Sequence, residues 1–434
     1  MTAAVLMIDD KDGLIAPGDL VFTAELKLRK CAQMSLKRLA LALVFVGCLL
    51  PAWPCEAQLG ICGIFWCSAV NYEVGPETAG VVAGDFDGDR RIDLAVTSES
   101  PDKVGVLRNV GNGIFAAPVN LALAGGSGPH SLAAADFDAD GDLDLVVTRH
   151  NEDDVQLLIN TSGVFSLGAI TGVAGSDPRQ VVTGDLDANG FMDVVTVNRG
   201  SDSISVLLNS GGVLVAAVTY PVGADPRGLA LGYLDNNAAL DLAVASHGAR
   251  EVELFLNDGS GVFVGGSKLS VGTELRPQGI AIEDLDADGD HDIATSTSGT
   301  AGNFATVFLN SGTAAFGAPS HYDSGGIEPS AIVIADFDRM LGNDIAVAIK
   351  DSDRPFGDPT SEVAVLRNLG EANFSSPRGR DVGASPESLV ASDLFGNGAF
   401  HLVSANRDDG NISTLRNWFV IFADGFEWGD TFAW

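Results

Sequence analysis

The feature that most constrains this chain is a unit of about fifty residues that occurs seven times. An aspartate-rich segment marks each copy, and successive segments start 51, 49, 48, 51, 52 and 57 residues apart. In six copies a proline stands seven residues before this start, and in all seven an asparagine ends a later apolar stretch. The segments start at Asp85, Asp136, Asp185, Tyr233, Asp284, Asp336 and Asp393. Such repetition predicts one repeat architecture rather than several unrelated domains.

Within one unit the pattern is that of four short strands. In the second copy, small residues at 131–135 precede a run rich in branched residues at 143–148, and two more strands are expected at 155–159 and 165–173. Four antiparallel strands in about fifty residues form one propeller blade, and the 52 glycines of the chain also favour β structure. A solenoid of seven units is the alternative, but it needs polar caps at both ends.

The two ends of the repeat region predict a closed ring. Residues 68–74 resemble a fourth strand with no blade before it, whereas the last copy ends at Asn417 after three strands. The early strand can complete the last blade and remove the exposed sheet edges. We therefore predict an all-β fold, a seven-bladed β-propeller of four-stranded antiparallel blades over residues 68–417.

The aspartate-rich segments have the spacing of a metal-binding loop. The second copy places carboxylates at loop positions one, three, five and nine, a glycine at six and an available carbonyl at seven. Oxygen donors without nitrogen or sulfur select Ca²⁺ over zinc or copper, and the carboxylates would repel one another without a cation. We expect about four Ca²⁺ ions. The predicted ligands are Asp85, Asp87, Asp89, Arg91 and Asp93; Asp136, Asp138, Asp140, Asp142 and Asp144; Asp185, Asp187, Asn189, Phe191 and Asp193; and Asp284, Asp286, Asp288, Asp290 and Asp292, where Arg91, Asp142, Phe191 and Asp290 act through backbone carbonyls.

The other three copies depart from this spacing. Copy six is a weaker candidate: it keeps Asp336, Asp338 and Asp344 but has Met340 at position five. Copy four has Tyr233 at position one. Copy seven has Phe395 at three and His401 at nine, so no ion is expected there. Asp-Gly turns with local hydrogen bonds are the alternative interpretation; they explain one loop but not the repeated spacing.

The unit Phe-Asp-x-Asp-Gly-Asp-x-Asp-Leu, between a strand entered by proline and a Leu-x-Asn-x-Gly turn, resembles the FG-GAP or VCBS repeat. The best-known members of that family are the calcium-binding propellers of integrin α subunits. The resemblance implies calcium ligation by the aspartates and ions in loops on one face of a seven-bladed ring. It supplies no single activity, because similar repeats occur in secreted adhesins, in accessory modules and beside enzymes.

The charge of the chain and its motifs exclude some classes of function. The chain has 58 acidic and 25 basic residues, and its only lysines after residue 57 are Lys103, Lys268 and Lys350, so nucleic-acid binding is excluded. It contains no His-Glu-x-x-His pair, Gly-x-Ser-x-Gly elbow or phosphate loop, and we predict that it is not an enzyme. His130, Arg179 and Arg227 occupy matching positions, where they would line one end of a central channel or act as solvated turn residues.

We therefore expect a calcium-binding scaffold that is a monomer and binds an unidentified protein or cell-surface ligand. The alternative is a glycan-active propeller, either a lectin or a polysaccharide lyase. The scarcity of Trp and Tyr counts against that alternative.

The segments outside the repeats predict export. Lys37 and Arg38 precede an apolar run at 39–50 and a small-residue cleavage site at 55–57, so residues 34–57 are interpreted as a signal peptide and 1–33 as an upstream over-read. Cleavage before Cys48 as a lipoprotein is the alternative. The signal is too short to span a membrane stably, and we expect a secreted or cell-surface protein, with the periplasm as another destination.

Two short segments flank the ring. Residues 58–67 carry Cys62 and Cys67, which are either a disulfide or two thiols. Residues 418–434 are an aromatic and acidic tail, interpreted as a sorting signal or as a strap on the ring.

Overall fold

The computed structural model describes residues 8–9, 13–14, 68–235, 237–351 and 361–417. The chain divides into two compact units, residues 1–56 and 57–434. In the first, β1 (Ile8–Asp9) pairs antiparallel with β2 (Gly13–Leu14). The predicted signal peptide, Cys62, Cys67 and the tail lie outside the described residues. In the part of the chain that the structure describes, no helix has the length and apolarity needed to cross a membrane.

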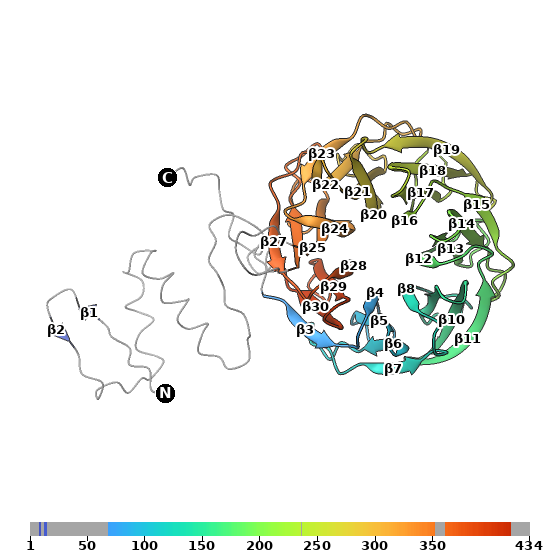
Figure 1. Ribbon diagram of the computed structural model, residues 1–434. Coiled ribbons are helices and arrows are strands. Elements are labelled where there is room, and N and C mark those ends of the chain that lie inside the picture. Colours follow the sequence, from blue (N-terminus) through green and yellow to red (C-terminus); the bar gives the residue numbers. More distant parts are fainter. Residues whose placement is uncertain (1–7, 10–12, 15–67, 236, 352–360, 418–434) are drawn as a thin grey trace. The chain divides into compact units, whose positions relative to one another are not determined.

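The second unit is a ring of seven four-stranded antiparallel sheets, shown in Figure 1, which confirms the predicted propeller. In blades 1 to 6 the strands follow one another in chain order from the inner to the outer edge, and in blade 7 the outer strand is β3. Blade 1 is β4 (Thr78–Gly84), β5 (Asp93–Glu99), β6 (Asp102–Leu107) and β7 (Val119–Ala122). Blade 2 is β8 (Pro129–Ala135), β9 (Asp144–Arg149), β10 (Asp154–Thr161) and β11 (Val164–Gly172). Blade 3 is β12 (Pro178–Gly184), β13 (Asp193–Asn198), β14 (Ser203–Leu207) and β15 (Val218–Pro221).

The remaining blades repeat this order. Blade 4 is β16 (Pro226–Gly232), β17 (Asp241–Ser246), β18 (Glu251–Asn257) and β19 (Phe263–Ser270). Blade 5 is β20 (Leu275–Glu283), β21 (Asp292–Gly299), β22 (Gly302–Phe308) and β23 (Ser320–Asp323). Blade 6 is β24 (Ile327–Ala335), β25 (Asp344–Asp351), β26 (Glu362–Leu366) and β27 (Arg378–Asp381). Blade 7 is β28 (Pro386–Ser392), β29 (His401–Asn406), β30 (Asn411–Leu415) and β3 (Val70–Glu73).

The early strand closes the ring as predicted. β3 pairs antiparallel with β30, with Val70 opposite Thr414 and Glu73 opposite Asn411. In Figure 1 the blue β3 lies against the red strands of the last blade. The closed ring therefore has no blade with a missing strand.

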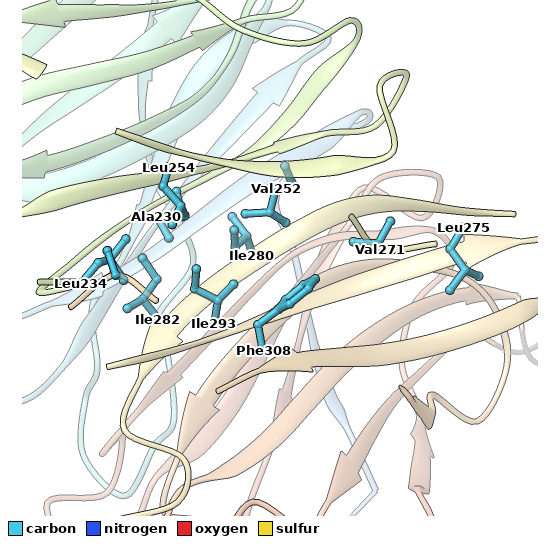
Figure 2. Close-up of a cluster of buried hydrophobic side chains, with 13 residues drawn as sticks. Ala230, Leu234, Val252, Leu254, Val271, Leu275, Ile280, Ile282, Ile293 and Phe308 are labelled. Atoms are coloured by element: carbon cyan, nitrogen blue, oxygen red, sulfur yellow. The ribbon is translucent and has the colours of Figure 1, made fainter. Parts of the chain in front are cut away.

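The core lies between blades rather than within one. Strands in the middle of each blade, such as β9 and β13, are buried at every residue because neighbouring blades cover both faces, whereas outer strands such as β7 and β15 are largely exposed. Figure 2 shows one of seven such clusters, in which Val252 and Leu254 of blade 4 pack with Ile280 and Phe308 of blade 5. One blade alone could not bury these faces, so the fold needs the whole ring.

Every inner strand has a β-bulge in its first half, where its register with the second strand shifts. In blades 2 to 7 the proline stands at the start of this bulge, where its missing N–H is tolerated. Blade 1 differs, because Thr78 takes the position of the proline and Pro76 lies before the strand.

The asparagine predicted to lie in a hairpin turn also connects neighbouring blades. In all seven blades its Nδ2 donates to a carbonyl of the preceding blade at 2.6–2.9 Å. The bond from Asn109 to Leu394 O joins blade 1 to blade 7. These interblade asparagines are Asn109, Asn160, Asn209, Asn257, Asn310, Asn368 and Asn417, and all of them are buried.

We expect Asn209→Ala to lower the free energy of unfolding by about 3 kcal/mol, because two carbonyls lose a buried donor. Asn209 Nδ2 donates to Phe137 O and Met192 O, and its Oδ1 accepts from Gly212 N. Urea unfolding followed by circular dichroism measures the change. The exposed neighbour Ser210 provides the control, and a loss for Asn209→Ala no larger than for Ser210→Ala would contradict the prediction.

Candidate metal centres

The aspartate-rich loop joins the inner strand of each blade to its second strand. In blade 2 it begins at Asp136, after β8, and ends at Asp144, the first residue of β9. Because all blades share one strand order, the seven loops emerge at the same end of the ring.

Among the described residues, the loop brings three carboxylates together in five blades. One oxygen from each of positions one, three and nine lies within 4.8 Å of the other two. The five groups are Asp85, Asp87 and Asp93; Asp136, Asp138 and Asp144; Asp185, Asp187 and Asp193; Asp284, Asp286 and Asp292; and Asp336, Asp338 and Asp344. Four belong to the copies predicted to hold calcium, and the fifth is the weaker candidate, copy six.

Position five is not part of these groups of three. One oxygen of Asp140 accepts from the backbone N–H of position seven at 2.9 Å, and Asp89, Asn189 and Asp288 make the same turn at 2.7–2.9 Å. The same bonds hold the backbone of the predicted position-seven residues Arg91, Asp142, Phe191 and Asp290.

Position one also shapes the loop. In blade 2, Asp136 Oδ2 accepts from Gly141 N at 3.0 Å, and the corresponding bond is present in blades 1, 3 and 5. Position six is left-handed in these four loops, at φ 68° for Arg90 and 88–95° for the three glycines. The residue at six must therefore tolerate positive φ, which explains the glycine in three of the four.

Position nine is a buried carboxylate with a structural role. Asp193 Oδ2 accepts from Leu186 N at 2.7 Å and its Oδ1 from Asn209 N at 2.6 Å. Burial raises the pKa of Asp93, Asp144, Asp193 and Asp292 to about 6, and the backbone donors oppose this shift. Charge repulsion from neighbouring aspartates is a smaller contribution to the same upward shift. A cation beside position nine would offset this repulsion and favour the ionised carboxylate.

The next blade covers each of the first three loops. A Cβ added to Gly163, in the outer turn of blade 2, would lie 2.7 Å from the Cβ of Asp87 in blade 1. Gly212 lies in the same way over Asp138, and Gly261 over Asp187. The glycine that follows the interblade asparagine therefore leaves room for position three of the preceding blade. The sequence predicted only a turn at this glycine. Its recurrence after the asparagine in successive copies was the one feature that could have pointed to this contact.

The donor sets of blades 1, 2, 3 and 5 fit a hard cation. Each offers carboxylate oxygens from positions one, three and nine and a further oxygen donor at five, with no nitrogen or sulfur ligand type. Blade 4 has Tyr233 at position one, and blade 7 has Phe395 and His401 at three and nine. The His401 side chain is buried, and burial lowers its pKa to about 4, so it is neutral at pH 7.

The two arginines that the sequence places at one end of a central channel, Arg179 and Arg227, form ion pairs with aspartates. Arg179 Nε lies 2.6 Å from Asp177 Oδ1, and Arg227 Nη2 lies 2.9 Å from Asp225 Oδ2. His130 Nδ1 lies 2.8 Å from Arg179 O. These contacts support structural roles for the three side chains.

The raised pKa values predict an unusual pH dependence. Without metal, an aspartate with pKa about 6 in the folded protein and 3.8 otherwise binds its proton more tightly when folded. The metal-free protein should therefore become more stable as pH falls from about 7.5 to 5. With Ca²⁺ present, protons compete with the ion, so the increase in melting temperature caused by Ca²⁺ should be largest above pH 7 and smaller at pH 5.

Melting curves with and without chelator across this pH range measure both effects. If the melting temperature of the metal-free protein fell steadily from pH 7.5 to pH 5, the raised pKa values of the position-nine aspartates would be wrong.

The fold and the loops define a class: closed repeat propellers with an acidic loop between the first two strands of each blade. A family model described as an FG-GAP-like repeat matches residues 85–147, 136–196 and 234–295. The chain therefore contains FG-GAP-like repeats in these three places, as the sequence predicts. No curated protein matches its sequence.

Solved structures share the fold at low sequence identity. BBS1N, crystallised with ARL6DN and soaked with lead, is 14% identical with a TM-score of 0.54, covering 81% of this chain and 96% of BBS1N. A protein from Lactobacillus plantarum is 15% identical with a TM-score of 0.53, covering 71% and 85% of the two chains. A protein titled a 6-phosphogluconolactonase from Bacteroides uniformis is 13% identical with a TM-score of 0.53, covering 81% and 95%. At this identity the similarity concerns the fold alone.

Proposed function

We propose that this protein is a secreted, calcium-binding propeller that serves as a non-catalytic binding scaffold. The observation that carries the proposal is the recurrence of one three-carboxylate group in the same loop of successive blades. A single acidic turn is common, but the same positions converging in blades 1, 2, 3 and 5 favour a shared cation ligand. Calcium suits these loops because they offer many oxygen donors in a flexible setting.

The ions would order one end of the ring. Without them, three or more carboxylates stand close together in each loop and repel one another. With them, loops from neighbouring blades form a rigid surface on which a protein or another cell-surface ligand can bind. The FG-GAP propeller fold suits such a scaffold role.

Equilibrium dialysis with Ca²⁺, followed by metal analysis, tests the metal part of the proposal. We expect about four ions per chain, one each in blades 1, 2, 3 and 5. A count of zero would reject calcium binding. Pull-down from cell surfaces with and without chelator then tests the scaffold role, and chelator-sensitive capture of a sugar without any protein would instead favour a lectin.

A further inference from the structure

An arginine stands immediately before the interblade asparagine in three blades. It is Arg108 in blade 1, Arg367 in blade 6 and Arg416 in blade 7, whereas blades 2 to 5 have Ile159, Leu208, Leu256 and Leu309 there. The three blades are consecutive around the ring, because blade 7 adjoins blade 1.

Each of these arginines contacts loop position three of its own blade. Arg108 Nη1 lies 3.4 Å from Asp87 Oδ2, and Arg367 Nε lies 2.6 Å from Asp338 Oδ2. In blade 7, where position three is Phe395, the Arg416 guanidinium carbon lies 4.3 Å from the centre of the ring. In blade 1 the Arg108 side chain is 43% exposed and its Nη2 donates to Gly163 O at 2.7 Å, so the arginine lies beside Asp87 rather than neutralising it.

The contact is closest in blade 6. The Asp338 side chain has no exposed surface, and a carboxylate buried in this way needs a counter-charge. The Arg367 Nε provides it at hydrogen-bonding distance. The Nη2 of Arg367 also reaches Met340 Sδ at 3.5 Å, at the position where blades 1, 2, 3 and 5 carry an oxygen donor.

The backbone of this loop also differs from the others. Arg339 at position four has positive φ, as position four does in blades 1, 2, 3 and 5, but the next residue with positive φ is Gly342 at position seven, and Leu341 stands at position six. Asp336 at position one accepts from Arg339 N at position four, as in blades 1 and 5, but among the described residues it has no counterpart of the position-six bond of blades 1, 2, 3 and 5. Although three carboxylates converge here, the loop does not fit calcium as those four loops do.

We propose that Arg367 is the built-in cation of blade 6 and that this blade takes no calcium. The inference rests on the proposed calcium binding of blades 1, 2, 3 and 5. The guanidinium neutralises the buried Asp338, and a calcium ion in the same loop would be repelled by it at short range. Because the arginine is covalently part of the chain, blade 6 keeps its counter-charge when calcium is removed.

Counting bound ions in two matched variants tests this proposal. Asp138→Asn changes position three in blade 2 and, at a Ca²⁺ concentration near the dissociation constant, where each site is half occupied, should lower the number of bound Ca²⁺ by about half an ion. Asp338→Asn makes the same change in blade 6 and should leave the number unchanged. Loss of an ion from both variants would overturn the inference and leave the proposed function standing, whereas no ion in the unsubstituted protein would reject the proposed function.

A second measurement decides the role of Arg367 even if no ion binds. In excess chelator, Arg367→Leu should lower the melting temperature, because Asp338 loses its partner. Arg378→Leu, at an exposed position of β27, is the control and should have little effect. An Arg367→Leu melt equal to that of the unsubstituted protein in chelator would overturn the inference. Circular dichroism of each variant shows whether it is folded before ions are counted.

Discussion

Removing calcium from the purified protein is expected to lower its melting temperature by about 10 °C or more. A ligand that binds only the folded state stabilises it by about 2.7 kcal/mol per site at one hundred times its dissociation constant. The four loops of blades 1, 2, 3 and 5 then contribute about 11 kcal/mol together, and each kcal/mol changes the melting temperature of a domain of this size by about 1–2 °C. The effect is large because the empty loops also leave their carboxylates to repel one another.

Differential scanning calorimetry with a calcium chelator, at constant ionic strength and with Mg²⁺ as control, measures this change. Magnesium should restore little of the lost stability, because it demands stricter octahedral geometry. An unchanged melt after thorough chelation would reject the metal assignment for all of these loops.

The second large effect is expected for Asp241→Ala, with a loss of about 2–5 kcal/mol in the free energy of unfolding. Asp241 is position nine of blade 4, where Tyr233 replaces the first ligand. Its side chain is fully buried and accepts from Leu234 N at 3.0 Å and from Asn257 N at 2.8 Å. Alanine leaves these buried N–H groups without an acceptor.

This loss should be the same with calcium and with chelator, because blade 4 is not expected to hold an ion. Asp235→Ala, at position three of the same loop, is the matched control and should cost less, since Asp235 is only partly buried. If the effect of Asp241→Ala disappeared in chelator, Asp241 would be a metal ligand rather than a structural acceptor.

Much of the architecture follows from local sequence. The fifty-residue period predicts the seven blades, and the unpaired strand at 68–74 predicts how the ring closes. The seven four-stranded sheets confirm the first prediction, and the pairing of β3 with β30 confirms the second. The predicted strands of the second copy differ from β8 to β11 by at most a few residues at their ends.

Only part of the candidate metal site could be predicted from local sequence. The spacing of Asp136, Asp138 and Asp144 predicts convergence because all three lie within nine residues of one loop. The spacing could not show that the side chain at position five accepts a hydrogen bond from the backbone N–H of position seven. From the spacing, Met340 at position five was the only sign that copy six differs from the calcium-binding copies.

The sequence by itself determined the repeat, the ring and the convergent carboxylates, because each depends on residues close together in the chain or on a pattern that recurs. Only the tertiary structure decided what lies against those loops. Asn160 reaches Phe86 O, 74 residues away, Gly163 lies over Asp87, and Arg367 pairs with Asp338 across 29 residues. These contacts depend on how the blades and strands pack, and packing brings together residues whose separation in the chain carries no periodic signal.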